Sequence, residues 1–135
     1  MAKGIARAVI EPPKPGEVTR EDRWRACRKL ADLQGWTGIH PYGNGGQMAG
    51  YKKNCSGMEI VPLPTEYWQD CMLLAHKCGL IIDLSVPGRV KVSGAPGEML
   101  YSRHPNADTA IRYAVVVAAI KQLEEKLENE QRQPA

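Results

Sequence analysis

Residues 107–120 read ADTAIRYAVVVAAI, and this stretch decides the fold. Beyond its first three residues, only Arg112 and Tyr113 interrupt the apolar run. The valine triplet alone would suit a strand, but the flanking alanines and the KQLEEKLENE sequence that follows favour a helix. A helix that is apolar nearly all round must be covered on more than one side. We therefore predict a long C-terminal helix, capped by Asn106 or Asp108, that lies inside the domain or in a subunit interface.

The same helix predicts self-association. A sheet of three or four short strands can scarcely cover it on both sides, and symmetric assembly is the common way to bury surplus apolar surface. We expect a homo-oligomer with an interface that includes Ile111, Val116, Ala119, Ile120 and Leu123. Because the apolar positions thin out after Ile120, the last turns should project into solvent or pair with another chain.

Length and composition limit the size of the domain and the classes of function that the chain can have. A chain of 135 residues suits a single domain with a core of ordinary size, although the absence of Phe leaves the packing to Val, Ile, Leu, Met and three Trp. The formal charge of +3 is below that expected of a dedicated nucleic-acid binder. The apolar segment 8–10 is too short for a signal peptide, and no stretch approaches the ~18 apolar residues of a membrane span. We expect a cytoplasmic protein with no membrane partner.

Four cysteines, Cys27, Cys55, Cys71 and Cys78, are then expected to be reduced thiols. Zinc sites usually contain C-x2-C or H-x3-H pairs, whereas the nearest spacings here are C-x6-C and His76-x-Cys78. We therefore predict thiols that belong to the core or are bystanders, with no metal and no cofactor.

Proline divides the chain near its start. Residues 1–18 contain EPPKPGE, which cannot continue a regular element, so we predict a proline-rich N-terminal arm. Residues 19–130 should form one domain, followed by a polar tail over 131–135. Thr19 and Asp22 resemble a capping box at the start of a first helix over 20–34.

Residues 36–56 are the least regular part of the domain. Four glycines in eight residues suggest a phosphate loop, but the spacing matches neither a dinucleotide fingerprint nor a P-loop. What remains is a long glycine loop, either a binding surface or a plain flexible connection. Its rim favours the first alternative, because aromatic and cationic side chains stack on bases or bind phosphates. The rim residues are His40, Tyr42, Tyr51, Lys52 and Lys53.

A short strand at 58–63 should be followed by a second helix, capped by Thr65 and ended by Gly79. Its apolar stripe comprises Tyr67, Trp68, Cys71, Leu74, Ala75 and Cys78. From Leu80 onward the spacing of the apolar residues is no longer helical. Three short strands at 80–84, 89–92 and 99–101, separated by VPG and GAPG turns, predict an antiparallel meander with one apolar face. The fold class is therefore α+β, with a small antiparallel sheet of three or four strands sandwiched by helices.

Three stretches resemble a known family. They are RKLADLQGWT at 28–37, YWQDCMLLAHKCGL at 67–80 and ADTAIRYAV at 107–115. They are similar to the small bacteriophage proteins of the phage "ABA sandwich" domain type. The glycine loop and the proline arm are not part of that family's pattern. The family has no established activity, so the resemblance implies the fold and a viral accessory origin in the host cytoplasm, and transfers no functional residue.

No catalytic constellation is present. The serines lack an elbow motif, and the three histidines lie in unrelated segments. We predict a non-catalytic binding protein, which as a phage accessory protein would sequester a phosphate-bearing signalling ligand or occupy a host protein, in the manner of a host-defence antagonist. The alternatives are a sequence-neutral nucleic-acid binder that uses the first helix and Lys52–Lys53, and a small enzyme of unknown class.

The predicted ligand site lies at the start of the long helix. Arg112 is expensive to bury alone, so we expect it to pair with a carboxylate such as Asp83 or to face an anion. In the second case, Arg103, His104 and Arg112 join the N–H groups of the helix N-terminus in an anion site. The loop that carries Tyr42, Tyr51, Lys52 and Lys53 would close over it.

Overall fold

The computed structural model describes residues 17–43, 46–53, 55–95 and 97–132. The predicted proline arm lies outside these residues except for its last two positions. The described chain is α+β, as predicted, with two small antiparallel sheets and three α-helices. The elements are α1 (Arg20–Leu33), β1 (Thr37–Tyr42), β2 (Gln47–Tyr51), β3 (Met58–Ile60), α2 (Trp68–Cys78), β4 (Ile82–Asp83), β5 (Arg89–Val92), β6 (Met99–Leu100), the 3-10 helix η2 (Tyr101–Arg103) and α3 (Ala107–Arg132).

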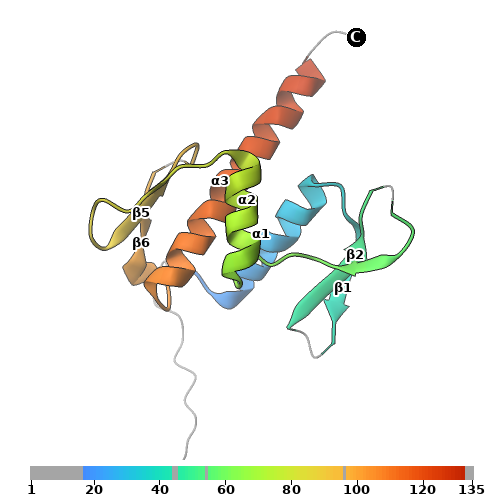
Figure 1. The fold of residues 1–135 in the computed structure, drawn as a ribbon, viewed down its shortest axis with the longest axis horizontal. Helices are drawn as coiled ribbons and strands as arrows, with labels where there is room; N and C mark the ends of the chain where they lie inside the picture. The colour runs from blue at the N-terminus through green and yellow to red at the C-terminus, as the bar shows by residue number, and fades with distance from the viewer. Residues whose placement is uncertain (1–16, 44–45, 54, 96, 133–135) are drawn as a thin grey trace, which may run out of the picture.

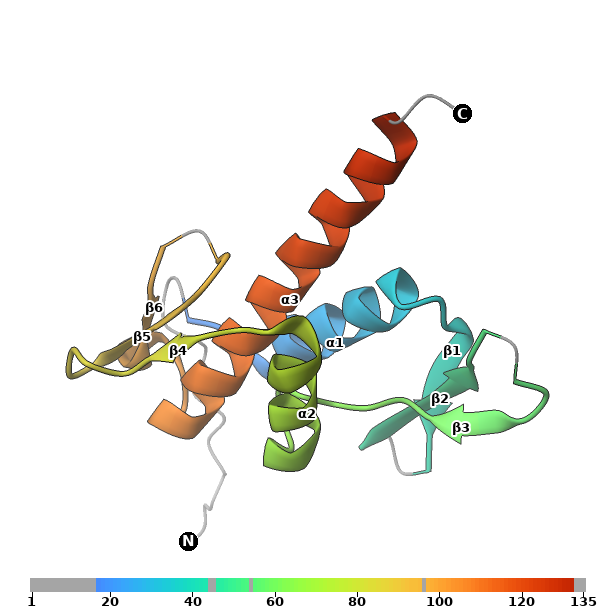
Figure 2. The same ribbon diagram turned by 45° about the horizontal axis from the view of Figure 1, so that its top comes forward.

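Helix α3 is the middle layer of the molecule (Figure 1). Helices α1 and α2 pack on one side of it, and strands β5 and β6 pack on the other. Its start is fixed by Asn106, whose Oδ1 accepts hydrogen bonds from the N–H and the hydroxyl of Thr109, each at 2.8 Å. The predicted helix and its cap are confirmed. Beyond the layers, the C-terminal end of α3 projects freely, as expected (Figure 2). In the described chain, no helix has the length and apolarity needed to cross a membrane.

Helix α1 begins with the predicted capping box. The N–H of Asp22 donates to Oγ1 of Thr19 at 3.1 Å, and the N–H of Thr19 donates to the Asp22 carboxylate at 2.9 Å. Val18, predicted to be part of the arm, is buried instead, and its N–H donates to the carbonyl of Arg103 at 2.8 Å. The domain therefore includes Val18, because this bond ties the chain before α1 to the turn before α3.

The glycine segment is not the irregular loop that the sequence predicts. Most of it forms β1 and β2, which pair with β3 in an antiparallel sheet of order β1-β2-β3. Glycine permits this pairing at Gly50, where an added Cβ would lie 2.9 Å from the main-chain oxygen of Thr37. The sheet and α1 share a small core of their own, formed by Cys27, Ala31, Trp36, Met48, Val61 and Leu63.

Helix α2 starts later than predicted. Its N-cap is Tyr67, which makes no side-chain capping bond. Thr65 cannot cap the helix, because it is buried and its Oγ1 lies 3.1 Å from the Sγ of Cys27 in α1. Gly79 ends the helix in the left-handed conformation, as predicted. Cys71, Leu74 and Ala75 face the core, but Tyr67 and Trp68 do not complete the predicted stripe, since both are exposed.

Strands β4, β5 and β6 form the predicted meander. Val90 and Val92 are buried beneath α3, whereas Lys91 between them is exposed, so the predicted alternation is confirmed. Strand β5 has the predicted bounds, whereas β4 and β6 are shorter than predicted and Tyr101 belongs to η2. The layers also differ from the prediction, because α3 lies between this sheet and the other two helices (Figure 2).

Candidate functional site

Arg112 does not pair with Asp83, the carboxylate predicted for it. Its Nε donates to the main-chain carbonyl of Thr65 at 2.9 Å, and its Cζ lies 5.0 Å from the centre of the Trp68 ring. Asp83 is exposed on β4 and accepts a hydrogen bond from the N–H of Ser85 instead. The predicted salt bridge is therefore wrong. One N–H of the guanidinium bonds to a carbonyl and the group lies over an indole face, so Arg112 ties α3 to the start of α2.

His104 is a core residue. The residue is only 7% exposed, and the centre of its imidazole ring lies 5.4 Å from the centre of the Tyr113 ring. Neither ring nitrogen has a hydrogen-bond partner among the residues described. Burial, followed by the positive charges of Arg23 and Arg103, lowers the pKa of His104 below its ordinary value of 6.5. The ring is thus held neutral and away from solvent, so its predicted role as an anion ligand is wrong.

The two halves of the predicted anion site are not brought together. Tyr42, Tyr51, Lys52 and Lys53 lie on or next to the β1–β3 sheet. Strand β6 and the start of α3, which flank Arg103, lie on the other side of α1 and α2 (Figures 1 and 2). The described residues of this segment, 42–43 and 46–53, do not lie over the start of α3, because strand pairing holds β1 and β2 beyond the other two helices (Figure 2).

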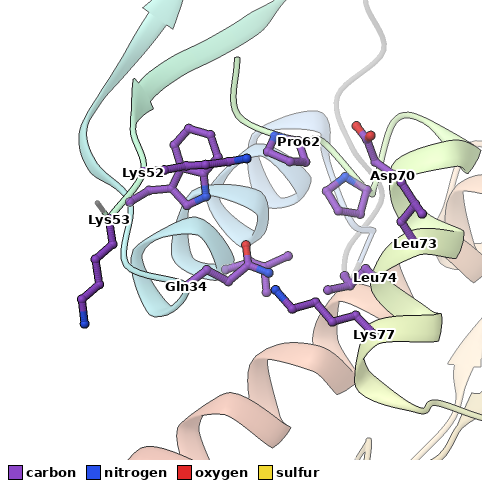
Figure 3. A pocket seen from close by; sticks show the side chains of 11 residues that line it. Gln34, Lys52, Lys53, Pro62, Asp70, Leu73, Leu74 and Lys77 are labelled. Atoms are coloured by element: carbon purple, nitrogen blue, oxygen red, sulfur yellow. The ribbon is translucent and has the colours of Figure 1, made fainter. Parts of the chain in front are cut away.

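Lys52 instead belongs to a cleft of about 400 Å³ between the end of α1, the β1–β3 sheet and α2 (Figure 3). We call this cavity the lysine cleft. It is lined by Leu30, Gln34, Trp36, Lys52, Lys53, Pro62, Pro64, Asp70, Leu73, Leu74 and Lys77. The side chains of Lys52 and Lys77 are directed into it, whereas Lys53 points away (Figure 3).

The interior of the lysine cleft is largely apolar, because Leu30, Trp36 and Leu74 form part of its wall. The Nζ of Lys52 lies 5.6 Å from the centre of the Trp36 ring and 3.4 Å from Oε1 of Glu59. The carboxylate of Asp70 accepts a hydrogen bond from the N–H of Leu63 at 3.0 Å. Sequence reasoning found Lys52 but missed Trp36 and Lys77, since only the tertiary fold joins them.

A second hollow, of about 450 Å³, adjoins the first. We call it the aromatic groove. It is lined by Gln47, Ile60, Val61, Pro62, Leu63, Tyr67, Trp68, Gln69 and Asp70, of which Pro62 and Asp70 also line the lysine cleft. Tyr67 is 50% exposed and Trp68 is 38% exposed. One turn further along α2, Met72 and Leu73 are also exposed, so apolar surface continues from the groove along the helix.

The predicted interface residues are largely covered within the chain. Val116 and Ala119 have 0% exposure, because α1, α2 and β5 surround this part of α3. Both are therefore wrong as interface residues. Ile111, Ile120 and Leu123 are partly buried and pack against the same core. Self-association itself stays a prediction.

The buried thiols are unsuited to nucleophilic chemistry. Burial raises the pKa of Cys27, and it raises the pKa of Cys71 to about 11. Both side chains thus remain protonated at neutral pH. Within the part of the chain that the structure describes, no three His, Cys, Asp or Glu side chains are grouped so as to hold a metal ion.

Comparison of the chain with protein-family models, with curated proteins and with solved structures gives no match.

Proposed function

We propose that this chain is a non-catalytic binding protein that attaches to a partner protein through the aromatic groove and the exposed side of α2. The observation that carries the proposal is the environment of Trp68. The indole is more than one-third exposed at 38%, yet Arg112 in α3 lies over its ring and is itself bonded to the Thr65 carbonyl. A charge placed within the apolar first half of α3 thus orients a tryptophan at the surface.

Such a tryptophan is well suited to bind a partner. Tyr, Trp and Met are enriched in protein interfaces, and the residues that dominate binding are most often Trp, Tyr and Arg. A side chain that is already fixed loses less conformational entropy on association. Tyr67, Met72 and Leu73 extend the same surface, and burial of one large apolar side chain contributes about 1.5–3 kcal/mol.

The resemblance to phage accessory proteins suggests the kind of partner. If the chain has that origin, the partner is a host protein, and occupation of that protein would serve the phage against host defence. Nucleic-acid binding has less support, because three of the basic side chains on α1 are engaged in ion pairs: Arg23 with Glu66 at 3.1 Å, Arg25 with Asp22 at 3.3 Å, and Lys29 with Glu124 at 3.0 Å.

The test compares three immobilised proteins in a bacterial lysate: the wild type, Trp68→Ala and Leu84→Ala. Leu84 is a matched control, because it is an exposed apolar residue outside the groove. A protein retained by the wild type and by Leu84→Ala is identified, purified and titrated by calorimetry. We expect Trp68→Ala to weaken its binding at least about tenfold, or ~1.4 kcal/mol. Equal affinity of Trp68→Ala and the wild type, or no retained protein, would overturn the proposal.

A further inference from the structure

The lysine cleft carries an inference that is independent of the partner protein. We propose that this cleft binds a small molecule in which a phosphate group is joined to a flat apolar portion, with the phosphate between Lys52 and Lys77. The two ammonium groups come from segments that are far apart in the sequence, and both are directed into one cavity (Figure 3).

The charges that line the cleft favour an anion. Lys52 and Lys77 are directed into the cleft (Figure 3), and Asp70 is the only acidic residue among the described residues that line it. The Asp70 carboxylate is held by the N–H of Leu63, which leaves it less available to neutralise a lysine. The amide of Gln34 lies near the end of Lys77 and offers a further hydrogen-bond donor (Figure 3). Lysine ammonium groups bind phosphate as point charges and do not require the fixed geometry of arginine.

The walls favour a ligand larger than phosphate alone. Leucine, tryptophan and proline side chains form most of the remaining lining, which suits a flat apolar group. A volume of about 400 Å³ lies within the range of ~300–1,000 Å³ that is usual for small-molecule sites. A nucleotide has the required combination of a ring and a phosphate, so adenosine 5′-monophosphate (AMP) is a suitable probe.

Glu59 competes for the same lysine. Its Oε1 lies 3.4 Å from Nζ of Lys52, and both side chains are about half exposed, at 44% and 48%. Glu59 is not among the residues that line the cleft. A phosphate in the cleft would therefore draw Lys52 away from Glu59, and the loss of this ion pair opposes binding. Removal of the Glu59 charge should tighten binding, which no defect in folding would do.

The experiment is a calorimetric titration of the folded full chain with AMP, inorganic phosphate and adenosine. We expect AMP to bind more tightly than either of its parts. Lys52→Ala and Lys77→Ala should each weaken AMP binding about tenfold, and Glu59→Gln should strengthen it by roughly threefold to tenfold. The matched controls are Lys126→Ala and Glu128→Gln, which make the same charge changes on the projecting end of α3. Both should bind AMP like the wild type.

Three results would overturn the site. They are the absence of AMP binding at millimolar concentration, equal effects of Glu59→Gln and Glu128→Gln, and equal effects of Lys52→Ala and Lys126→Ala. The last two would show that AMP senses only the net charge of the protein. The two proposals share lining residues, since Leu73 belongs to both surfaces, but the test of the partner proposal uses Trp68, which does not line the lysine cleft, so the two can fail separately.

Discussion

Arg112 illustrates how a single charged residue is tolerated in an apolar helix. A buried guanidinium without partners would be costly, and the sequence offers Asp83 as the nearest plausible carboxylate in a strand. The structure uses a main-chain carbonyl and an aromatic face instead, neither of which is a charged group. A sequence pattern does not reveal such partners, because every residue has a carbonyl.

A first prediction follows for Arg112→Met. The substitution keeps much of the apolar length of the side chain but leaves the Thr65 carbonyl without its donor, so stability should fall by about 1–3 kcal/mol. Urea denaturation measures this change. Arg28→Met, on the exposed side of α1, is the control and should change stability by less than about 0.5 kcal/mol. Equal stability of the two variants would show that the Arg112 bond contributes nothing.

A second prediction concerns pH and His104. Its pKa in the folded protein is lowered from 6.5, chiefly by burial, so the unfolded chain binds more protons than the folded chain as the pH falls below 6.5. Stability that is present above this pH should therefore be lost as the pH falls toward the lowered value. His104→Leu should show a smaller loss between neutral and mildly acidic pH in urea denaturation. The control is His76→Leu, which makes the same replacement at an exposed position outside the core.

The cysteines give a third prediction. Cys55 is exposed, whereas Cys27 and Cys71 are buried, and burial raises the pKa of both. Iodoacetamide at neutral pH should therefore modify Cys55 in the folded protein and leave Cys27 and Cys71 unmodified until urea is added. Mass spectrometry of tryptic peptides reads this out. Fast labelling of Cys71 in the folded protein would contradict the packing of α2 on α3.

At the scale of elements, the segment at 36–56 shows where sequence patterns fail. Alternating apolar residues identify β5, and caps with a helical period identify α1 and α3. Strands β1 and β2 lack such an alternation of apolar and polar residues, and the glycines of this segment suggest a loop. Gly50 is needed because β1 approaches it closely, which is a property of the paired strands. Lys52 could be predicted as a site residue from its own basic side chain. Its neighbours Trp36 and Lys77 could not, because only the paired strands and packed helices bring them to the same cleft.

The fourth prediction tests that close approach. Gly50→Ala places a Cβ 2.9 Å from the Thr37 oxygen, so the β1–β2 pairing must shift, and stability should fall by about 1–3 kcal/mol. Gly57→Ala is a matched control, because its Cβ would meet nothing within 4 Å. Thermal melting followed by circular dichroism compares the two. Similar melting temperatures would mean that the hairpin is not paired as described.

At the scale of the whole molecule, the coverage of α3 changes the prediction of self-association. A sheet of three short strands is too small to cover this helix on both sides, but α1 and α2 cover the side that the sheet leaves open. The sequence could not show this, because the periodicity of α1 and α2 identifies their apolar faces and not their targets. The apolar surface of α3 that stays open to a second chain includes its projecting end (Figure 2), where Leu127 is exposed.

The fifth prediction separates folding from assembly. Val116→Glu buries an unpaired charge in the core and should unfold the chain. Leu127→Glu should fold normally, and light scattering at micromolar concentration should then give the mass of one chain, against a larger mass for the wild type. A wild-type mass of one chain would end the prediction that α3 mediates self-association.

Thr65 contacts residues of both α1 and α3, so it joins three segments of the chain that are synthesised at very different times. Its Oγ1 touches Cys27 at 3.1 Å, and its carbonyl receives the bond from Arg112 at 2.9 Å. The other elements described precede α3 in the chain, so during synthesis on the ribosome α1, α2 and β5 emerge with their apolar faces uncovered. Contacts over such sequence distances form slowly, and exposed apolar surface promotes aggregation. The nascent chain therefore cannot complete its core until α3 has been translated, so the last helix to be made closes the fold.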